Sequence, residues 1–312
     1  MIESGSLTPG IDPARFGLPP HTAVRYERPD PALERMIADY HMFDSEEHAV
    51  NRAIEWMLPN SPAIRIILAD RPIRLALAGA RYDPLPTACF FGPTSQAMEI
   101  EVSGGLTIGA SLTPIGFARL LRTSAAELRD NVLPLEHVMP REQVAVLVER
   151  LRDHDRGRRV KAILDEFFLP LMSRPHRDEP ELMRIMAALQ GDNLDNLGDI
   201  ADQLGIPSHR LLRLCQRHFG FPPKTLLMRA RLLRSILTLK LNGNRTGYVG
   251  IDPAYFDHSH FVRDARRFLG MTPRQFLQLE TPYLNASLRA RAMVFGVNVA
   301  ALQPATGNSL GA

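Results

Sequence analysis

The sequence predicts an α+β protein in which a small β-rich domain with trailing helices precedes an all-α twin helix-turn-helix domain. Short apolar runs separated by Gly, Pro and Ser fill residues 63–112. Strands at such close spacing are typical of an antiparallel sheet, a sandwich or a cupin-like barrel. After Pro114 the apolar period becomes helical. Finally, a helical segment at residues 208–220 returns in altered form at residues 258–270, which indicates a duplicated unit.

The composition is that of a soluble globular protein with two domains. The chain has 312 residues, of which 45% are hydrophobic and 23% charged. The net charge is only +3, so any strong basic character must be local. Cys89 and Cys215 lie far apart in apolar surroundings and predict reduced, buried thiols of a cytoplasmic protein. We expect no signal peptide and no membrane span, because no long apolar run is present.

The β-rich part begins after a segment of unusual composition. Residues 1–20 contain four prolines and three glycines and predict a disordered arm. Residues 21–172 form the expected sensor or dimerisation domain. Apolar residues at helical spacing predict an early helix over Ala32–Tyr40. The expected strands cover residues 63–68, 73–78, 88–92, 98–102 and 106–112.

Helices follow these strands. The pattern predicts helices over residues 115–122, 125–132, 141–152 and 159–171. Ser124, with Glu127 three residues later, is a candidate N-cap for the second of them. Amphipathic helices that follow a small sheet usually pack on it. Residues 173–181 (SRPHRDEPE) carry two prolines and alternating charge and predict an interdomain linker.

The C-terminal domain, residues 182–280, begins with a helix-turn-helix pattern. Apolar residues on one face predict a helix over Leu197–Leu204, and Gly205 ends it. Ser208 is an N-cap type that opens the next helix. In this motif the second helix reads DNA. Residues 281–312 form a tail, with a further helix expected over 286–294.

A helical wheel of the first reading helix places Leu211, Leu212, Cys215 and Phe219 together, with polar residues opposite. The candidate DNA-contacting residues are Ser208, His209, Arg210, Leu212, Arg213, Gln216 and Arg217. The copy, 50 residues later, offers His258, Ser259, His260, Arg263, Arg266 and Arg267.

A solvated charged face is the simpler alternative for either helix. The local charge argues against it, because residues 203–251 contain nine Lys or Arg and no acid. Such a concentration of cations in a near-neutral chain predicts a polyanion partner.

The connecting segment has a suitable length. A helix from Pro222 or Pro223 to Leu241 would span roughly 27 Å, against about 34 Å between successive major grooves. It could hold both reading helices near one DNA turn apart. Lys224, Arg229 and Arg245 are candidate phosphate contacts, or simply solvated cations.

Residues 195–280 resemble the DNA-binding domain of AraC-type transcription regulators. The most specific stretch is YFDHSHFVRDARRFLGMTPRQFL, Tyr255–Leu277. The resemblance implies a sequence-specific regulator whose N-terminal domain binds an effector or dimerises. The expected partners are double-stranded DNA, a second copy of the chain, a small-molecule effector and RNA polymerase, with no membrane.

The second unit departs from the family pattern before its reading helix. Residues 246–254 contain Gly247, Gly250 and Pro253, which disfavour a helix interior. We expect a short or distorted scaffold helix there. An alternative function follows, in which the second unit is degenerate and the protein acts mainly by protein–protein contact.

Other residues were weighed for chemistry. His258 and His260 point apart on a helix and lack a third ligand, so we expect no metal site. No nucleotide-binding or hydrolase motif is present, so we expect neither an enzyme nor a cofactor. An enzyme in the N-terminal part has no positive support. Trp56, Phe90, Phe91 and Phe117 are candidates for a small-molecule pocket, or simply core residues.

Overall fold

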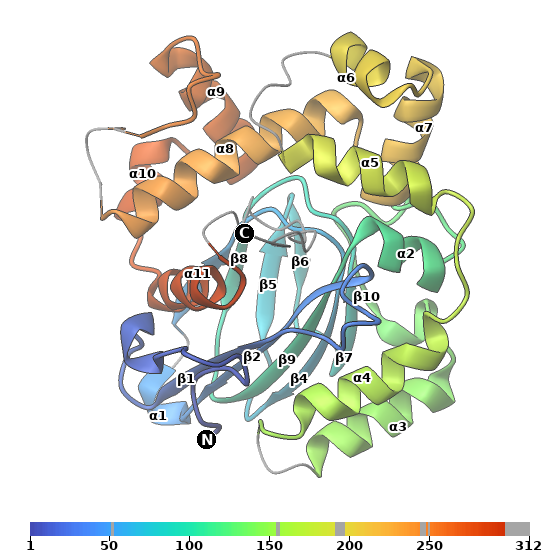
Figure 1. Cartoon of the computed structure of the whole chain (residues 1–312). Coiled ribbons are helices and arrows are strands. Elements are labelled where there is room, and N and C mark those ends of the chain that lie inside the picture. Colours follow the sequence, from blue (N-terminus) through green and yellow to red (C-terminus); the bar gives the residue numbers. More distant parts are fainter. Residues whose placement is uncertain (51–52, 154–156, 191–196, 244–247, 249, 297–312) are drawn as a thin grey trace.

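The computed structural model describes residues 1–50, 53–153, 157–190, 197–243, 248 and 250–296 (Figure 1). It combines a β-rich N-terminal part with a helical C-terminal part, as the sequence predicts. All strand pairs are antiparallel. One sheet has the order β1 (Thr22–Glu27), β2 (Ile37–Ser45), β9 (Gly105–Leu112), β4 (Ala63–Ala69), β7 (Ala88–Phe91) and β10 (Val132–Pro134). The other has the order β3 (Ile54–Met57), β8 (Met98–Glu101), β5 (Arg74–Leu77) and β6 (Ala80–Tyr82).

The larger sheet has two different faces, because successive side chains of a strand alternate. In β2, Tyr40 and Met42 belong to the main hydrophobic core, whereas Asp39 and His41 lie on the opposite face. The same division recurs across β9 and β4. The main core lies between this sheet and the helices α2 (Pro114–Leu120), α3 (Arg141–Arg152), α4 (Val160–Leu171) and α5 (Glu179–Gln190).

Two predicted helices of the N-terminal part are wrong. Residues 31–36 form turns and Ile37–Ser45 forms β2, which is paired with β1 and β9. Residues 125–131 also form turns, followed by β10. The Ser124 hydroxyl does accept a hydrogen bond from the Ala126 amide at 3.3 Å. Backbone hydrogen bonds from Gly92 to Asn131 and from Asp130 to Pro93 hold this segment in a non-helical conformation.

The C-terminal part is built along one long helix. The first unit consists of α6 (Leu197–Leu204) and α7 (Ser208–Phe219), followed by α8 (Pro223–Leu241). The second contains α9 (His258–Leu269) and α10 (Pro273–Gln278), followed by α11 (Pro282–Phe295). Figure 1 shows α6 and α7 at one end of α8, and α9 and α10 at the other.

The expected interdomain linker is partly helical and firmly attached. Helix α5 begins at Glu179, whose carboxylate forms a two-point ion pair with Arg119 of α2, at 2.6 and 2.7 Å. Asp178 is buried and lies 3.0 Å from His218 of α7. Residues of α6, α7 and α8 also belong to the main core. The segment therefore ties the helix-turn-helix units to the sheet instead of separating them.

The first twenty residues are ordered, contrary to the prediction of a disordered arm. Ile2 and Phe16 are 4% and 0% exposed, and the segment includes a 3-10 helix, Pro13–Phe16. The Ile2 amide donates to Asp44 of β2 at 2.6 Å. Prolines and glycines shape this loop, but two apolar anchors fix it.

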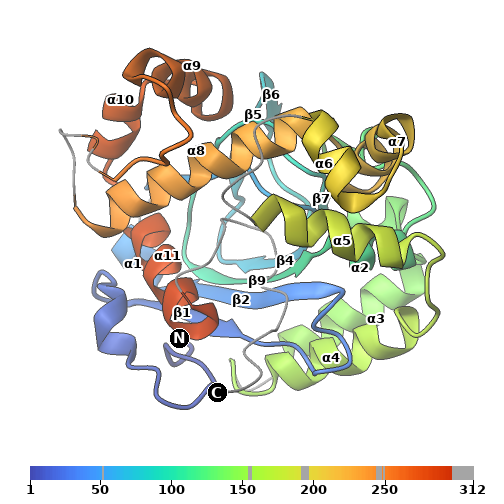
Figure 2. The same ribbon diagram turned by 45° about the horizontal axis from the view of Figure 1, so that its top comes forward.

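The arm packs against the end of the chain. Figure 2 shows α11 lying along β1, close to the N-terminal segment. A separate hydrophobic cluster joins Phe16, Val24 and Tyr26 to α11, where Ala286, Ala290 and Val294 are buried. None of the helices in the described ranges is long and apolar enough to cross a membrane.

Replacing Phe16 by Ala should destabilise the protein, because Phe16 is fully buried in this cluster. We expect a loss of about 3–5 kcal/mol in the free energy of unfolding, measured by urea denaturation. Leu7→Ala is the matched control in the same arm, since Leu7 is 57% exposed. Equal effects of the two changes would show that the arm is not anchored as described.

Candidate nucleic-acid interface and internal cavity

The first helix-turn-helix unit has the expected turn but a different cap. Gly205 has φ of +59°, a backbone conformation that favours glycine. The first residue of α7 is Ser208, and Pro207 is the N-cap; its carbonyl accepts from the amides of Arg210 and Leu211 at 2.9 Å. The prediction that the Ser208 side chain caps the helix is wrong, because Ser208 lies one residue inside it.

Helix α7 presents a polar, cationic face away from the core. Its buried residues are Leu211, Leu214, Cys215, His218 and Phe219. Its exposed residues are Ser208, His209, Leu212, Arg213, Gln216 and Arg217. Leu212 is 37% exposed, so it does not join the buried stripe as the wheel predicted.

Two of the predicted contacts on α7 are engaged within the protein. Arg210 forms a two-point ion pair with Glu181 of α5, with both N–O distances 2.6 Å. Arg217 donates to the carbonyl of Arg122 at 3.3 Å. Arg213 lies on the exposed face between them.

Helix α9 presents a second cationic face. Asp257 caps it by accepting from the His260 amide at 2.7 Å. Its exposed residues are His258, Ser259, Arg263, Arg266 and Arg267, and its buried ones are Phe261, Asp264, Ala265, Phe268 and Leu269. His260 is half-buried, with Nε2 3.1 Å from Arg231 of α8, so it faces the protein more than the other predicted contacts do.

The segment before α9 contains no helix over residues 248 and 250–257, the part of it that the structure describes. Side chains of α8 hold it instead. Arg234 forms an ion pair with Asp252 at 2.7 Å, and Ser235 accepts from the Asp252 amide at 2.9 Å. The second unit therefore has a regular helix α9, preceded by a segment that is irregular over its described residues, in line with the expected distortion.

The three predicted phosphate contacts lie in different environments or outside the described residues. Lys224 is exposed at the start of α8. Arg229 does not lie on the surface that its predicted role requires. It is 5% exposed, donates to the Thr94 carbonyl at 3.2 Å and covers the Phe221 ring at 4.9 Å. Burial lowers the pKa of Arg229 to about 10. Arg245 lies outside the described residues.

A cavity of about 140 Å³ lies between the two sheets and α11. Trp56 lines it. Phe90 and Phe117 lie in the main core with ring centroids 6.4 Å apart, and Phe91 lies in the core between the sheets, beneath Arg65. These three phenylalanines are core residues. The polar residues of the lining include Tyr26, Asp39, His41, Glu55, Arg65, Ser111, Tyr283 and Arg291.

Asp39 forms the centre of a buried polar network at this cavity. It accepts from Ser111 at 3.0 Å, lies 2.8 Å from His41 Nδ1 and forms an ion pair with Arg291 of α11 at 2.9 Å. Burial alone would raise the pKa of Asp39, but the Arg291 charge and the His41 contact outweigh it and lower it to about 2. Burial lowers the pKa of His41, which favours a neutral ring whose Nδ1 donates to Asp39.

Glu55 of β3 holds the other end of α11. Its carboxylate accepts from the amides of Tyr283 and Leu284 at 2.9 and 3.3 Å, which are unpaired donors of the first helical turn. Burial raises the pKa of Glu55 to about 7, although these amides favour the charged form. The sequence gives no sign of this network, because its members are far apart in the chain.

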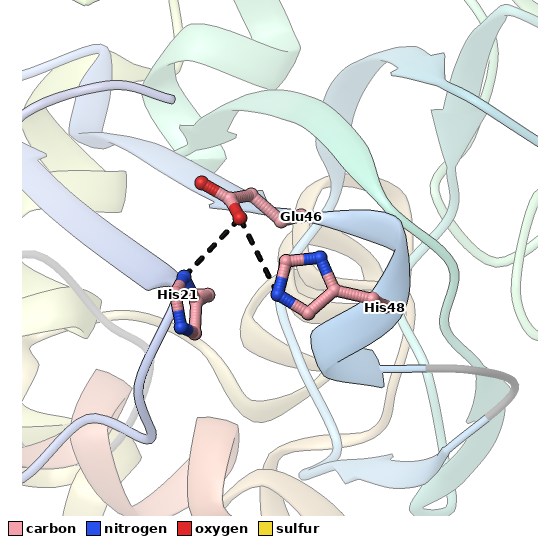
Figure 3. A group of neighbouring side chains, drawn as sticks. All are labelled: His21, Glu46 and His48. Atoms are coloured by element: carbon pink, nitrogen blue, oxygen red, sulfur yellow. Dashed lines mark ion pairs between the residues drawn. The ribbon is translucent and has the colours of Figure 1, made fainter.

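A surface cluster also joins residues that are distant in sequence. His21, Glu46 and His48 point toward one another (Figure 3), with nitrogen–oxygen distances of 3.2 and 3.5 Å. Their donor atoms could hold a metal ion, but all three side chains are at least 45% exposed. Contacts of the two imidazoles with the Glu46 carboxylate explain the same geometry.

Two helices with exposed cationic faces, each part of a helix-turn-helix unit on one connecting helix, define a DNA-binding domain. A family model described as a helix-turn-helix domain matches residues 200–279. These residues are an AraC-type helix-turn-helix domain, which confirms the resemblance drawn from Tyr255–Leu277. No curated protein matches the chain.

Several solved structures are similar to this chain at low identity. ToxT from Vibrio cholerae is 13% identical, with a TM-score of 0.42, and the match covers 72% of this chain and 95% of that one. ToxT bound to an unsaturated fatty acid is 14% identical, with a TM-score of 0.42 and coverages of 72% and 90%. The AraC-like transcriptional activator CuxR is 15% identical, with a TM-score of 0.24 and coverages of 69% and 86%.

The raised pKa of Glu55 predicts a pH-dependent stability. Between pH 4.5 and about 7 the folded protein keeps a proton that the unfolded chain has lost, so the free energy of unfolding falls as pH rises. The loss is on the order of 1.4 kcal/mol for each unit of pKa shift. Urea denaturation from pH 4.5 to 8 gives the free energy of unfolding of the wild type and of Glu55→Gln. We expect the difference between the two values to grow up to pH 7. A constant difference would contradict the assignment.

Proposed function

We propose that the protein is a sequence-specific transcription regulator that inserts α7 and α9 into successive major grooves of DNA. The observation that carries this proposal is the pair of exposed cationic helix faces at opposite ends of α8. The 19 residues of α8 span about 28 Å. This length suits two reading helices placed about one DNA turn apart.

The side chains on these faces have the chemistry of base readers. Arg213 and Arg263 occupy equivalent positions in the two units, and both are exposed. Arginine can donate two hydrogen bonds to guanine O6 and N7, the commonest specific contact in the major groove. Lys224 then supplies a phosphate contact that positions the domain without reading sequence.

Control through the N-terminal part is supported by the way both units are docked on it. The Ala125 amide donates to the carbonyl of Arg217 at the end of α7, at 2.7 Å. The Ala97 amide donates to the carbonyl of Phe268 in α9, at 2.8 Å. A change in the N-terminal part, caused by a ligand or by assembly, would therefore alter the placement of both reading helices. Homodimer formation and contact with RNA polymerase belong to this proposal through the family resemblance alone.

A second candidate function has its own support. The described residues before α9 form no scaffold helix, which favours a degenerate second unit. In that case the protein would act mainly through protein–protein contact and would bind DNA poorly. Comparing the two units separately distinguishes these functions.

Replacing Arg213 or Arg263 by Ala should weaken binding to a specific operator by about 1–3 kcal/mol each, through loss of a base contact. Mobility shifts on the DNA upstream of the protein's own coding region, with bulk DNA as competitor, measure this loss. Arg152→Ala is the matched control, because Arg152 is exposed on α3, away from the DNA-binding domain. The reading assignment is wrong if neither change lowers specific binding relative to bulk DNA.

The salt dependence of binding separates the two candidate functions. A regulator that contacts several phosphates should lose affinity steeply between 50 and 200 mM salt, since each neutralised phosphate releases counterions. Wild-type protein with a slope near zero would favour the protein-contact function. An effect of Arg213→Ala without any effect of Arg263→Ala would place all base reading in the first unit.

A further inference from the structure

The cavity contains a buried cation that forms no ion pair within the part of the chain that the structure describes. Arg65, in the middle of β4, is 8% exposed. Its Nη1 donates to the thioether sulfur of Met57 at 2.9 Å, and among the described residues its Nε has no hydrogen-bond partner. A thioether is a weak acceptor, and a buried charge is costly unless it is paired. The guanidinium lies 4.8 Å from the centre of the Phe91 ring, which offsets only part of that cost.

The acids of the cavity are committed elsewhere. The carboxylate of Asp39 is paired with Arg291 and is also bound by His41 and Ser111. Glu55 accepts from the first turn of α11. Among the described residues, neither carboxylate therefore forms an ion pair with Arg65, whose charge is left without a salt-bridge partner in the cavity wall. A buried, uncompensated arginine that lines a cavity is a binding position for an anion.

The shape of the cavity limits what can accompany that anion. Gly109 of β9 pairs with His41 of β2 on one side and with Arg65 of β4 on the other. A Cβ at this position would come within 2.0 Å of His41 Nε2, so the glycine leaves room for the imidazole ring. The volume of about 140 Å³ is near that of an engineered protein cavity, roughly 150 Å³, that binds benzene. Much of the remaining wall is apolar. A compact apolar body with one anionic group fits this volume and lining.

The apolar wall of the cavity is also part of the core of the second helix-turn-helix unit. Trp56 packs edge-on against Phe276 of α10, with ring centroids 6.4 Å apart. Leu58, Leu284 and Leu288 line the cavity and belong to the hydrophobic cluster that contains Phe261 and Phe268 of α9. An occupant of the cavity would therefore touch side chains that support α9 and α10.

We propose that this cavity binds a small organic monoanion, a compact monocarboxylate, that pairs with Arg65, and that its occupancy is transmitted to α9 through the shared wall. The transmission to α9 rests on the proposed function, whereas the binding of the anion does not. Helix α11, which follows the matched domain, lines the site together with the two sheets.

The single tryptophan of the chain makes binding measurable in the intact protein, because Trp56 lies in the cavity wall. Benzoate and cyclohexanecarboxylate serve as probes, and their amides serve as neutral isosteres. We expect both acids to change Trp56 fluorescence saturably, and the amides to bind about tenfold more weakly or not at all.

Arg65→Met tests the anion position, and Arg81→Met, on the exposed edge strand β6, is the matched control. We expect Arg65→Met to lose the preference for acids over amides while Arg81→Met retains it. Without ligand, Arg65→Met should melt at the same temperature as the wild type or higher, because an unpaired buried charge is removed. Retained acid preference in Arg65→Met, or no binding of either acid to the wild type, would overturn the proposal. A much lower melting temperature would also overturn it, by showing that Arg65 is structural.

Transmission is tested by measuring operator affinity with and without saturating benzoate, for the wild type and Arg65→Met. We expect a several-fold shift for the wild type alone. Benzoate that binds without any shift would refute transmission but leave the site. If the protein binds no DNA specifically in any condition, the proposed function fails, whereas the fluorescence titration still decides whether the anion site exists.

Discussion

The carboxylate of Asp39 is the constraint on which the arrangement of this molecule depends. A buried charge must be paired, and Asp39 forms an ion pair with Arg291, more than 250 residues later in the chain. This pairing fixes α11 over the open face of the larger sheet. Once α11 is fixed, Glu55 caps its first turn, and its Leu284 and Leu288 line the cavity and pack in the same cluster as α9 and α10.

The helical C-terminal part could be predicted closely from sequence, and the β-rich part only in outline. Residues 223–241 follow one long helical period, and no other pattern fits them. Leu33, Met36, Ile37 and Tyr40 satisfy a helical spacing equally well, although the chain enters a strand at Ile37. The alternation of Asp39 and His41 with Tyr40 and Met42 was the signal for that strand. Pairing with β1 and β9, which no local pattern encodes, decided the outcome.

The reading faces of α7 and α9 could be predicted because they depend on the geometry of a single helix. What those side chains contact could not, because it depends on other elements. Arg210 meets Glu181 of α5, His260 meets Arg231 of α8, and Arg229 lies against Thr94. A helical wheel shows none of these contacts. In each case the contacting residue belongs to another element and is brought close only by the tertiary structure. The polar lining of the cavity could not be predicted for the same reason, since Arg65 is a single polar residue in an apolar strand.

The meeting of the N-terminal arm with α11 has a consequence for how the protein is made. Phe16 and Tyr26 leave the ribosome long before Ala286 and Val294, their partners in the same cluster. At about 5–20 residues per second the interval is on the order of tens of seconds. During that time β1 has an uncovered apolar face and the cavity has no roof. The apolar face of β1 is therefore buried only after α11 has been synthesised.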